Sequence, residues 1–387
     1  MIEETMKVPF AVPECGNEEI EEVVAVIKSG WLTTASRCAK FEEDFAAYIG
    51  ARHALAVNSA TAALHLGLEA LGVRNNDMVL VPTFTFTATA EVVRYLNAHP
   101  IFVDCDPKTF CITAEHIQKA LDINKISLSD GRLKCLIPVH FGGHPCEMDD
   151  LLAFALKYNL EIMEDAAHAL PTRYKEKLIG TLGHVTCFSF YANKTMTTGE
   201  GGMLCTDDDD IAGRVKVMRL HGINRDVWDR FSTGASWEYD VIAPGFKYNM
   251  PDTVAAIGIH QLIKVEEFRL KRQRIAETYF QALKNIPGLS LPLPDCSMKD
   301  HSWYVQQLAH YTWAKTKKIA SKTEIIKSLY EVINAMSDFL GVNFIIDQRV
   351  KGKVNIHTAG EIDKRRLLPI METIFEMNNI AMIEYGD

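Results

Sequence analysis

Three side chains with complementary chemistries follow one another along the chain. Asp165 comes after an apolar run at 160–163, Ser189 lies in an aromatic run at 185–190, and Lys194 follows that run. A carboxylate can pair with a protonated pyridine nitrogen, a hydroxyl can bind a phosphate, and an amine can condense with an aldehyde. Pyridoxal 5′-phosphate (PLP) carries these three groups. A lone lysine after a strand is usually a solvated loop residue, but the three side chains in this order favour a PLP pocket.

Each of these residues needs a particular environment to do that chemistry. Lys194 must be a neutral amine to attack an aldehyde and later move protons, so burial or nearby positive charge should lower its pKa. Asp165 would keep the ring nitrogen protonated, so that the ring accepts electrons. The alternative for Asp165 is a helix N-cap. His168 could stack against the cofactor ring or hydrogen-bond its oxygen, or it could be a structural histidine.

A phosphate and a ring face need further partners. Ser59, Ala60 and Thr61 stand at a strand-to-helix turn, where backbone N–H groups and small hydroxyls bind phosphate, although Ser and Thr are also ordinary helix caps. Ser189 can add another hydroxyl. Phe86 is a candidate to cover the outer face of the ring, and its alternative is a core aromatic.

Short apolar strands separated by helices must position these residues. Such alternation predicts an α/β fold, with a mostly parallel sheet covered by helices on both faces. We expect a helix from Asn17, acting as its N-cap, to a stop at Gly30, a second at 60–71 and a long one at 251–268. The predicted strands are 54–57, 78–81, 101–103, 134–139, 160–163, 185–190 and 203–205.

The character of the sequence changes after the long helix. We expect a large domain at 1–265 and a smaller α+β region at 266–387. In the latter, residues 324–340 have the apolar period of a helix, and 342–346 and 353–356 have the pattern of strands. The run Asp207–Asp210 is predicted to be a solvated loop that caps the next helix, so we expect no metal site.

Composition limits the partners and the compartment. A net charge of −9 gives no basic surface for nucleic acid or an anionic membrane. Nine scattered cysteines without a C-x-x-C pair indicate free thiols in a reducing cytosol. The chain begins with an acidic segment instead of a signal peptide, and no apolar run approaches membrane-spanning length. We therefore expect a cytoplasmic protein that binds neither nucleic acid nor membranes.

The motifs together resemble one enzyme family. Over residues 8–305 the chain is similar to the DegT/DnrJ/StrS-type sugar aminotransferases, which are PLP-dependent and have the aspartate-aminotransferase architecture (fold type I). The resemblance implies a large domain with a seven-stranded-type sheet and a smaller C-terminal domain. The segments that carry it are 29–34, 58–65, 82–86, 164–168, 188–202, 221–222 and 245–250.

The resemblance implies an activity and assigns roles. The enzyme would move an amino group from glutamate to a nucleotide-linked keto sugar, with the cofactor alternating between PLP and its amine form, PMP. It implies a homodimer with shared active sites, in which Lys247 and Asn249 reach the phosphate of the neighbouring subunit. The remaining roles are the Schiff-base lysine for Lys194, the pyridinium partner for Asp165, a place beside the ring for His168, the phosphate cup for Ala60, Thr61 and Ser189, and the stacking position for Phe86.

Two departures from the family pattern keep alternatives open. Ala35 stands where the family usually has glycine, and the family pattern cannot be followed after about residue 305. Instead, residues 343–354 resemble the periplasmic N-terminal domains of secretins. One alternative is therefore a non-catalytic, PLP-binding interaction protein. The other is a PLP- or PMP-dependent sugar dehydratase, but those relatives replace the lysine by histidine, so Lys194 argues against it.

Overall fold

The computed structural model describes residues 12–128, 130–224, 239–283, 289–290, 301–304 and 309–310. Contacts within the chain divide it into a unit of residues 1–309 and a unit of residues 310–387. The elements predicted at 324–340, 342–346 and 353–356 lie outside the described residues.

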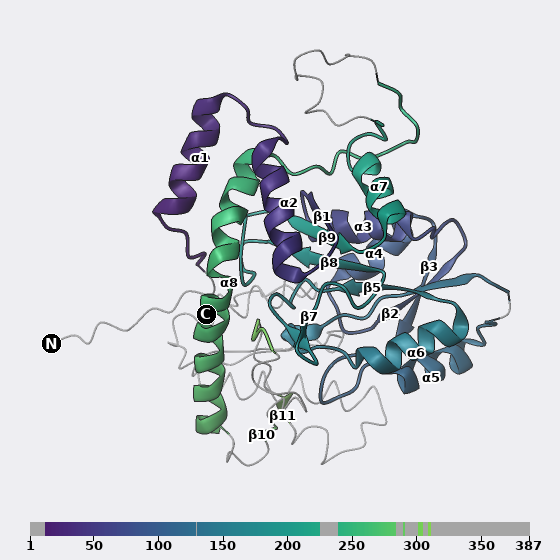
Figure 1. Cartoon of the computed structure of the whole chain (residues 1–387). Helices are drawn as coiled ribbons and strands as arrows, with labels where there is room; N and C mark the ends of the chain where they lie inside the picture. The colour runs from purple at the N-terminus through teal and green to yellow at the C-terminus, as the bar shows by residue number, and fades with distance from the viewer. Residues whose placement is uncertain are drawn as a thin grey trace, which may run out of the picture. The chain divides into compact units, whose positions relative to one another are not determined.

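The first unit is built on a seven-stranded, mostly parallel sheet (Figure 1). In sheet order the strands are β1 (His53–Val57), β9 (Gly202–Thr206), β8 (Val185–Ser189), β5 (Glu161–Asp165), β4 (Leu133–Leu136), β2 (Met78–Pro82) and β3 (His99–Val103). β5 pairs in parallel with β4 and β8, and β2 pairs in parallel with β3 and β4, whereas β9 runs antiparallel to both β1 and β8. The α/β fold predicted from the sequence is thereby confirmed.

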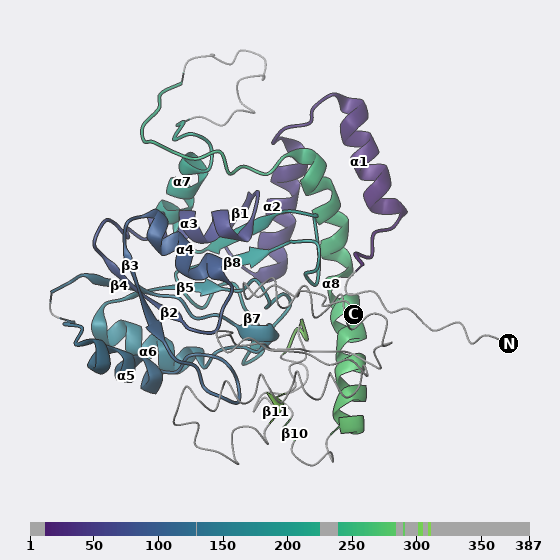
Figure 2. The same ribbon diagram turned by 180° about the vertical axis from the view of Figure 1, so that it is seen from behind.

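Helices cover both faces of this sheet, because alternate strand residues point to opposite sides. Ala54 and Ala56 of β1 join a core with α2 (Ser36–Ile49), α5 (Ala114–Asn124), α6 (Met148–Tyr158) and α8 (Asp252–Leu283). Leu55 and Val57 join a second core with α3 (Ala60–Ala70), α4 (Thr87–Tyr95) and α7 (Asp209–Met218). α5 and α6 lie side by side in both views (Figure 1 and Figure 2).

The remaining elements are short or peripheral. α1 (Asn17–Ser29) packs on α8. A 3₁₀ turn covers Phe141–Gly143, and a small hairpin joins β6 (Arg173–Tyr174) and β7 (Lys177–Leu178). Two-residue strands lie at β10 (Leu289–Ser290) and β11 (Ala309–His310). No helix among the described residues is both long and apolar enough to cross a bilayer.

The helix ends agree with the predicted capping residues, except at the start of α1. The N-cap of α1 is Gly16 and not Asn17, because the Gly16 amide donates to Glu19 Oε2 at 2.8 Å. The predicted stop is confirmed, with Gly30 in the left-handed region at φ 76°. The predicted aspartate cap is also confirmed, since the Asp208 side chain accepts hydrogen bonds from the first turn of α7.

The long helix α8 extends well past its predicted end. It spans 32 residues, Asp252–Leu283, without a break. The first residue of α8, Asp252, also caps the N-terminus of α2. Its Oδ1 accepts hydrogen bonds from the backbone amides of Ala35 and Cys38 at 2.7 and 3.0 Å. The domain boundary predicted at residue 265 lies inside α8 and stays a prediction.

Candidate active site

The candidate residues gather at one edge of the sheet because of strand direction. Asp165 and Ser189 are the last residues of the parallel strands β5 and β8. Antiparallel β9 begins at Gly202, which pairs with Ser189 on one side and with Val57 on the other. The carboxyl ends of parallel strands are where α/β proteins bind ligands.

Asp165 is a buried carboxylate with two hydrogen-bond donors. It is 5% exposed, Oδ2 accepts from Thr89 Oγ1 at 2.8 Å, and Oδ1 accepts from the Ala167 amide at 3.1 Å. Burial raises the pKa of Asp165, while these hydrogen bonds and the charge of Lys194 oppose the rise. The alternative role as a helix N-cap is wrong, because Asp165 ends a strand and residues 166–171 are not helical.

Lys194 lies half-buried in the loop between β8 and β9. Burial lowers the pKa of Lys194 to about 8, against the opposing attraction of Asp165. Its Nζ lies 4.3 Å from the ring centroid of Tyr304, whose hydroxyl donates to Asn193 Oδ1 at 3.0 Å. The amine is therefore close to its neutral form at mildly alkaline pH.

His168 is a neutral histidine against the same tyrosine. Its ring stacks on Tyr304, with centroids 4.3 Å apart and planes 24° apart. Nδ1 accepts from the Gly142 amide at 3.3 Å, so the ring proton is on Nε2. Burial, together with the charge of Lys194, lowers the pKa of His168 to about 3.

The turn after β1 packs directly against the start of β9. Ser59 caps α3, its Oγ accepting from the Ala62 amide at 3.1 Å, and Ala60 and Thr61 form the first turn of that helix. A Cβ at Gly202 would lie 2.6 Å from the Ser59 carbonyl oxygen and from the Ala60 nitrogen. Only glycine therefore lets β9 approach this turn so closely.

Lys247 and Asn249 lie beside the same turn of their own chain. The Asn58 amide donates to the Tyr248 carbonyl at 2.8 Å, and Asn249 bridges to Val57. Lys247 Nζ donates to Asn249 Oδ1 at 2.6 Å, and Asn249 Nδ2 donates to Thr34 Oγ1 at 2.6 Å. Their predicted reach into a neighbouring subunit stays a prediction.

Phe86 stands at the start of α4 and is 75% exposed. The alternative that it is a core aromatic is therefore wrong, and an open aromatic face remains. The sequence reading missed Thr89 and Tyr304 as neighbours of the candidate residues. Tyr304 lies at the C-terminal limit of the range 8–305 over which the chain resembles the family, outside the segments that carry the resemblance, and Thr89 had no local signal.

The close approach at Gly202 gives a first prediction. Gly202→Ala should displace the Ser59 turn, lower stability by about 1–3 kcal/mol and weaken PLP binding, because backbone atoms occupy the space of the new Cβ. Gly213→Ala is the matched control. It lies in α7 with open space around it, so alanine should stabilise the helix by about 0.5–1 kcal/mol. Calorimetric melting and PLP titration measure both, and equal behaviour of the two variants would contradict the close approach.

The fold is that of an α/β protein with its candidate ligand-binding residues at the carboxyl edge of the sheet. Residues 13–339 match the model of the DegT/DnrJ/EryC1/StrS aminotransferase family, and the chain belongs to that family. Residues 327–387 match the model of the GspD-like N0 domain, which confirms the predicted likeness of the C-terminal segment to secretins.

Individual relatives cover most of the chain. Protein MJ1066 of Methanocaldococcus jannaschii is 47% identical over 308 residues, which are 80% of this chain and 77% of that protein. The spore coat polysaccharide biosynthesis protein SpsC of Bacillus subtilis is 41% identical over 328 residues, 84% of this chain and 81% of that one. The PMP form of Streptococcus pneumoniae Spr1654 has a TM-score of 0.71 and 28% identity, covering 84% of each chain, and its PLP form has also been solved.

Proposed function

We propose that this protein uses PLP to transfer an amino group from glutamate to a nucleotide-linked keto sugar. The observation that carries the proposal is that a buried carboxylate, Asp165, and an amine of lowered pKa, Lys194, interact electrostatically at the carboxyl edge of the sheet. The PLP and PMP forms of Spr1654 support the cofactor, and the name of SpsC supports a sugar acceptor used for polysaccharide synthesis.

The residues present fit PLP. Gly202 lets β9 lie directly against the Ser59 turn, and the first turn of α3, with Ser189 nearby, offers donors to a phosphate. Phe86 has an open aromatic face. When bound, PLP supplies an electron-accepting ring that stabilises negative charge on the substrate carbon.

Side chains of the protein would orient the cofactor and carry protons. The Asp165 carboxylate would hold a proton on the ring nitrogen by charge, and Thr89 orients that carboxylate. Lys194 Nζ would hold the aldehyde and later carry a proton to and from the substrate. His168 is neutral and can donate from Nε2 to a ring oxygen.

The lowered pKa of Lys194 gives a pH prediction. In the cofactor-free protein, acylation of Lys194 by a neutral ester should rise with pH and level off above about 8, because only the neutral amine reacts. Peptide mass spectrometry after short labelling times measures the midpoint. A midpoint near 10.5, the ordinary pKa of a lysine, would contradict the lowering by burial.

We also propose a homodimer with shared active sites. Support comes from large apolar side chains left exposed near the Lys247 segment and the site: Phe86, Tyr95, Tyr239, Val241 and Ile242. Chains carrying Lys194→Ala and chains carrying Lys247→Ala with Asn249→Ala should each be inactive. Mixed dimers should regain activity in one of their two sites, because that site combines an intact Lys194 from one chain with an intact Lys247 and Asn249 from the other. An active monomer in sedimentation, or no recovery in dimers verified by mass, would contradict sharing.

Nitrogen transfer tests the function itself. The protein is incubated with PLP, ¹⁵N-glutamate and a panel of nucleotide-linked keto sugars, and the masses of the products are measured by mass spectrometry. The proposal expects ¹⁵N in a nucleotide-linked amino sugar. Loss of water from the sugar without ¹⁵N would identify a dehydratase. PLP binding without any product would favour the non-catalytic interaction protein, which the N0-type match at 327–387 makes the second candidate.

A further inference from the structure

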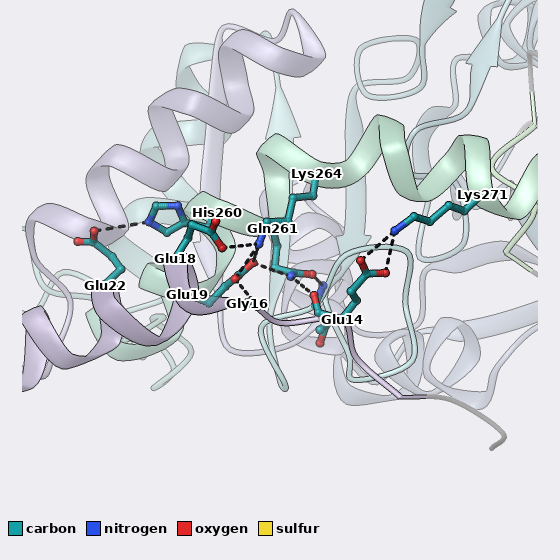
Figure 3. Close-up of polar contacts among 10 residues, drawn as sticks. Glu14, Gly16, Glu18, Glu19, Glu22, His260, Gln261, Lys264 and Lys271 are labelled. Atoms are coloured by element: carbon teal, nitrogen blue, oxygen red, sulfur yellow. Dashed lines mark hydrogen bonds and ion pairs between the residues drawn. The ribbon is translucent and has the colours of Figure 1, made fainter. Parts of the chain in front are cut away.

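Gln261 is a buried amide in α8 that contacts three separate parts of the chain. It is 1% exposed. Its Nε2 donates to the Glu14 carbonyl at 2.8 Å and to Glu19 Oε1 at 2.9 Å (Figure 3), and its Oε1 accepts from the Thr197 amide at 3.3 Å. One side chain therefore links the N-terminal segment and α1 to the loop that carries Lys194.

Glu19 fixes which way the Gln261 amide points. Glu19 is 2% exposed, and both of its oxygens accept from Lys264 Nζ at 2.8 Å. Burial works to raise the pKa of Glu19, but hydrogen bonds from Lys264, Gln261 and the Gly16 amide lower it to about 2. An ionised carboxylate only accepts hydrogen bonds, so Gln261 must turn its NH₂ group toward Glu19 and its oxygen toward Thr197.

Thr197 needs that oxygen. It is 4% exposed, and its hydroxyl already donates to the Phe190 carbonyl at 3.0 Å and accepts from the Gly199 amide at 2.9 Å. The Thr197 amide would otherwise be a buried donor without a partner, which is costly. Loss of Gln261 should therefore shift the 194–199 segment instead of leaving it in place.

We infer that Gln261, oriented by Glu19 and Lys264, is a positioning residue that ties α1 to the Lys194 loop and sets where the lysine amine stands. This rests on the proposed function, because it assumes that Lys194 holds the PLP aldehyde. A purely structural role would change stability alone. A positioning role changes the rate at which Lys194 reacts in molecules that are folded.

The test follows PLP attachment to the cofactor-free, full-length chain by stopped-flow absorbance. Gln261→Met keeps the volume but removes the hydrogen bonds, and it should slow attachment about tenfold. Lys271→Ala is the control: it removes the exposed pair with the Glu14 carboxylate at 2.9 Å, which joins the same segments without reaching the loop, and its rate should equal wild type. A wild-type rate in folded Gln261→Met protein overturns the inference, whatever its melting temperature.

A charge exchange provides a second test that does not depend on the methionine variant folding. Gln261→Glu sets a carboxylate against Glu19 and should slow attachment. Adding Glu19→Gln restores a donor–acceptor pair and should recover most of the rate, and failure to recover overturns the inference. Borohydride reduction and peptide mass first locate PLP in the wild type. Attachment elsewhere than Lys194 would defeat the proposed function, whereas attachment at Lys194 with equal rates in all variants would defeat only the positioning role.

Discussion

Replacing Lys194 by alanine should abolish amino transfer, by at least about 10⁴-fold, while the protein still folds. The same amine holds the aldehyde and moves the proton. None of its described neighbours offers a second amine, because Tyr304 is a phenol, Asn193 an amide and Asp165 a carboxylate. Steady-state turnover measures the loss, and circular dichroism verifies the fold.

A matched control separates this effect from the removal of any lysine. Lys119 is exposed on α5, which holds none of the candidate residues, and Lys119→Ala should turn over like wild type. More than a small residual activity in the Lys194→Ala variant would remove Lys194 from its assigned role.

Replacing Asp165 by asparagine should slow the proton-transfer step by about 10²–10⁴-fold while PLP still binds. The amide cannot hold the ring proton by charge, so the ring becomes a weaker electron acceptor. Single-turnover kinetics with glutamate measure the step, and PLP absorbance measures occupancy.

Thr89 offers a graded comparison for Asp165. Thr89→Val removes the 2.8 Å hydrogen bond to Oδ2 and should cost about tenfold, whereas Thr89→Ser keeps the hydroxyl and should cost less. Near-normal single-turnover rates in Asp165→Asn protein with full PLP occupancy would assign the electron-sink role to another group.

The sheet and its carboxyl edge could be predicted from the sequence because both depend on local patterns. Apolar runs marked the strands, and parallel strands necessarily bring Asp165 and Ser189 to one edge. Strand ends were less certain: the run predicted at 101–103 is the end of β3, which starts at His99 and includes Pro100. A proline is tolerated there because β3 is the edge strand, a position that the sequence does not reveal.

The contacts that orient the site could not be predicted, because they join residues far apart in sequence. Thr89 reaches Asp165 across 76 residues, and Asp252 caps α2 across more than 200. Neither residue has a distinctive neighbourhood in the sequence. Gln261 likewise looks like one polar position on a helix until packing places it between Glu19 and Thr197.

The visible spectrum of the PLP-loaded protein tests the central claim most directly. We predict a band from PLP held on Lys194, the disappearance of that band when glutamate is added, and its return when a nucleotide-linked keto sugar follows. A band that glutamate leaves unchanged, in protein whose PLP is located on Lys194 by reduction and peptide mass, would contradict the claim that this chain transfers amino groups from glutamate.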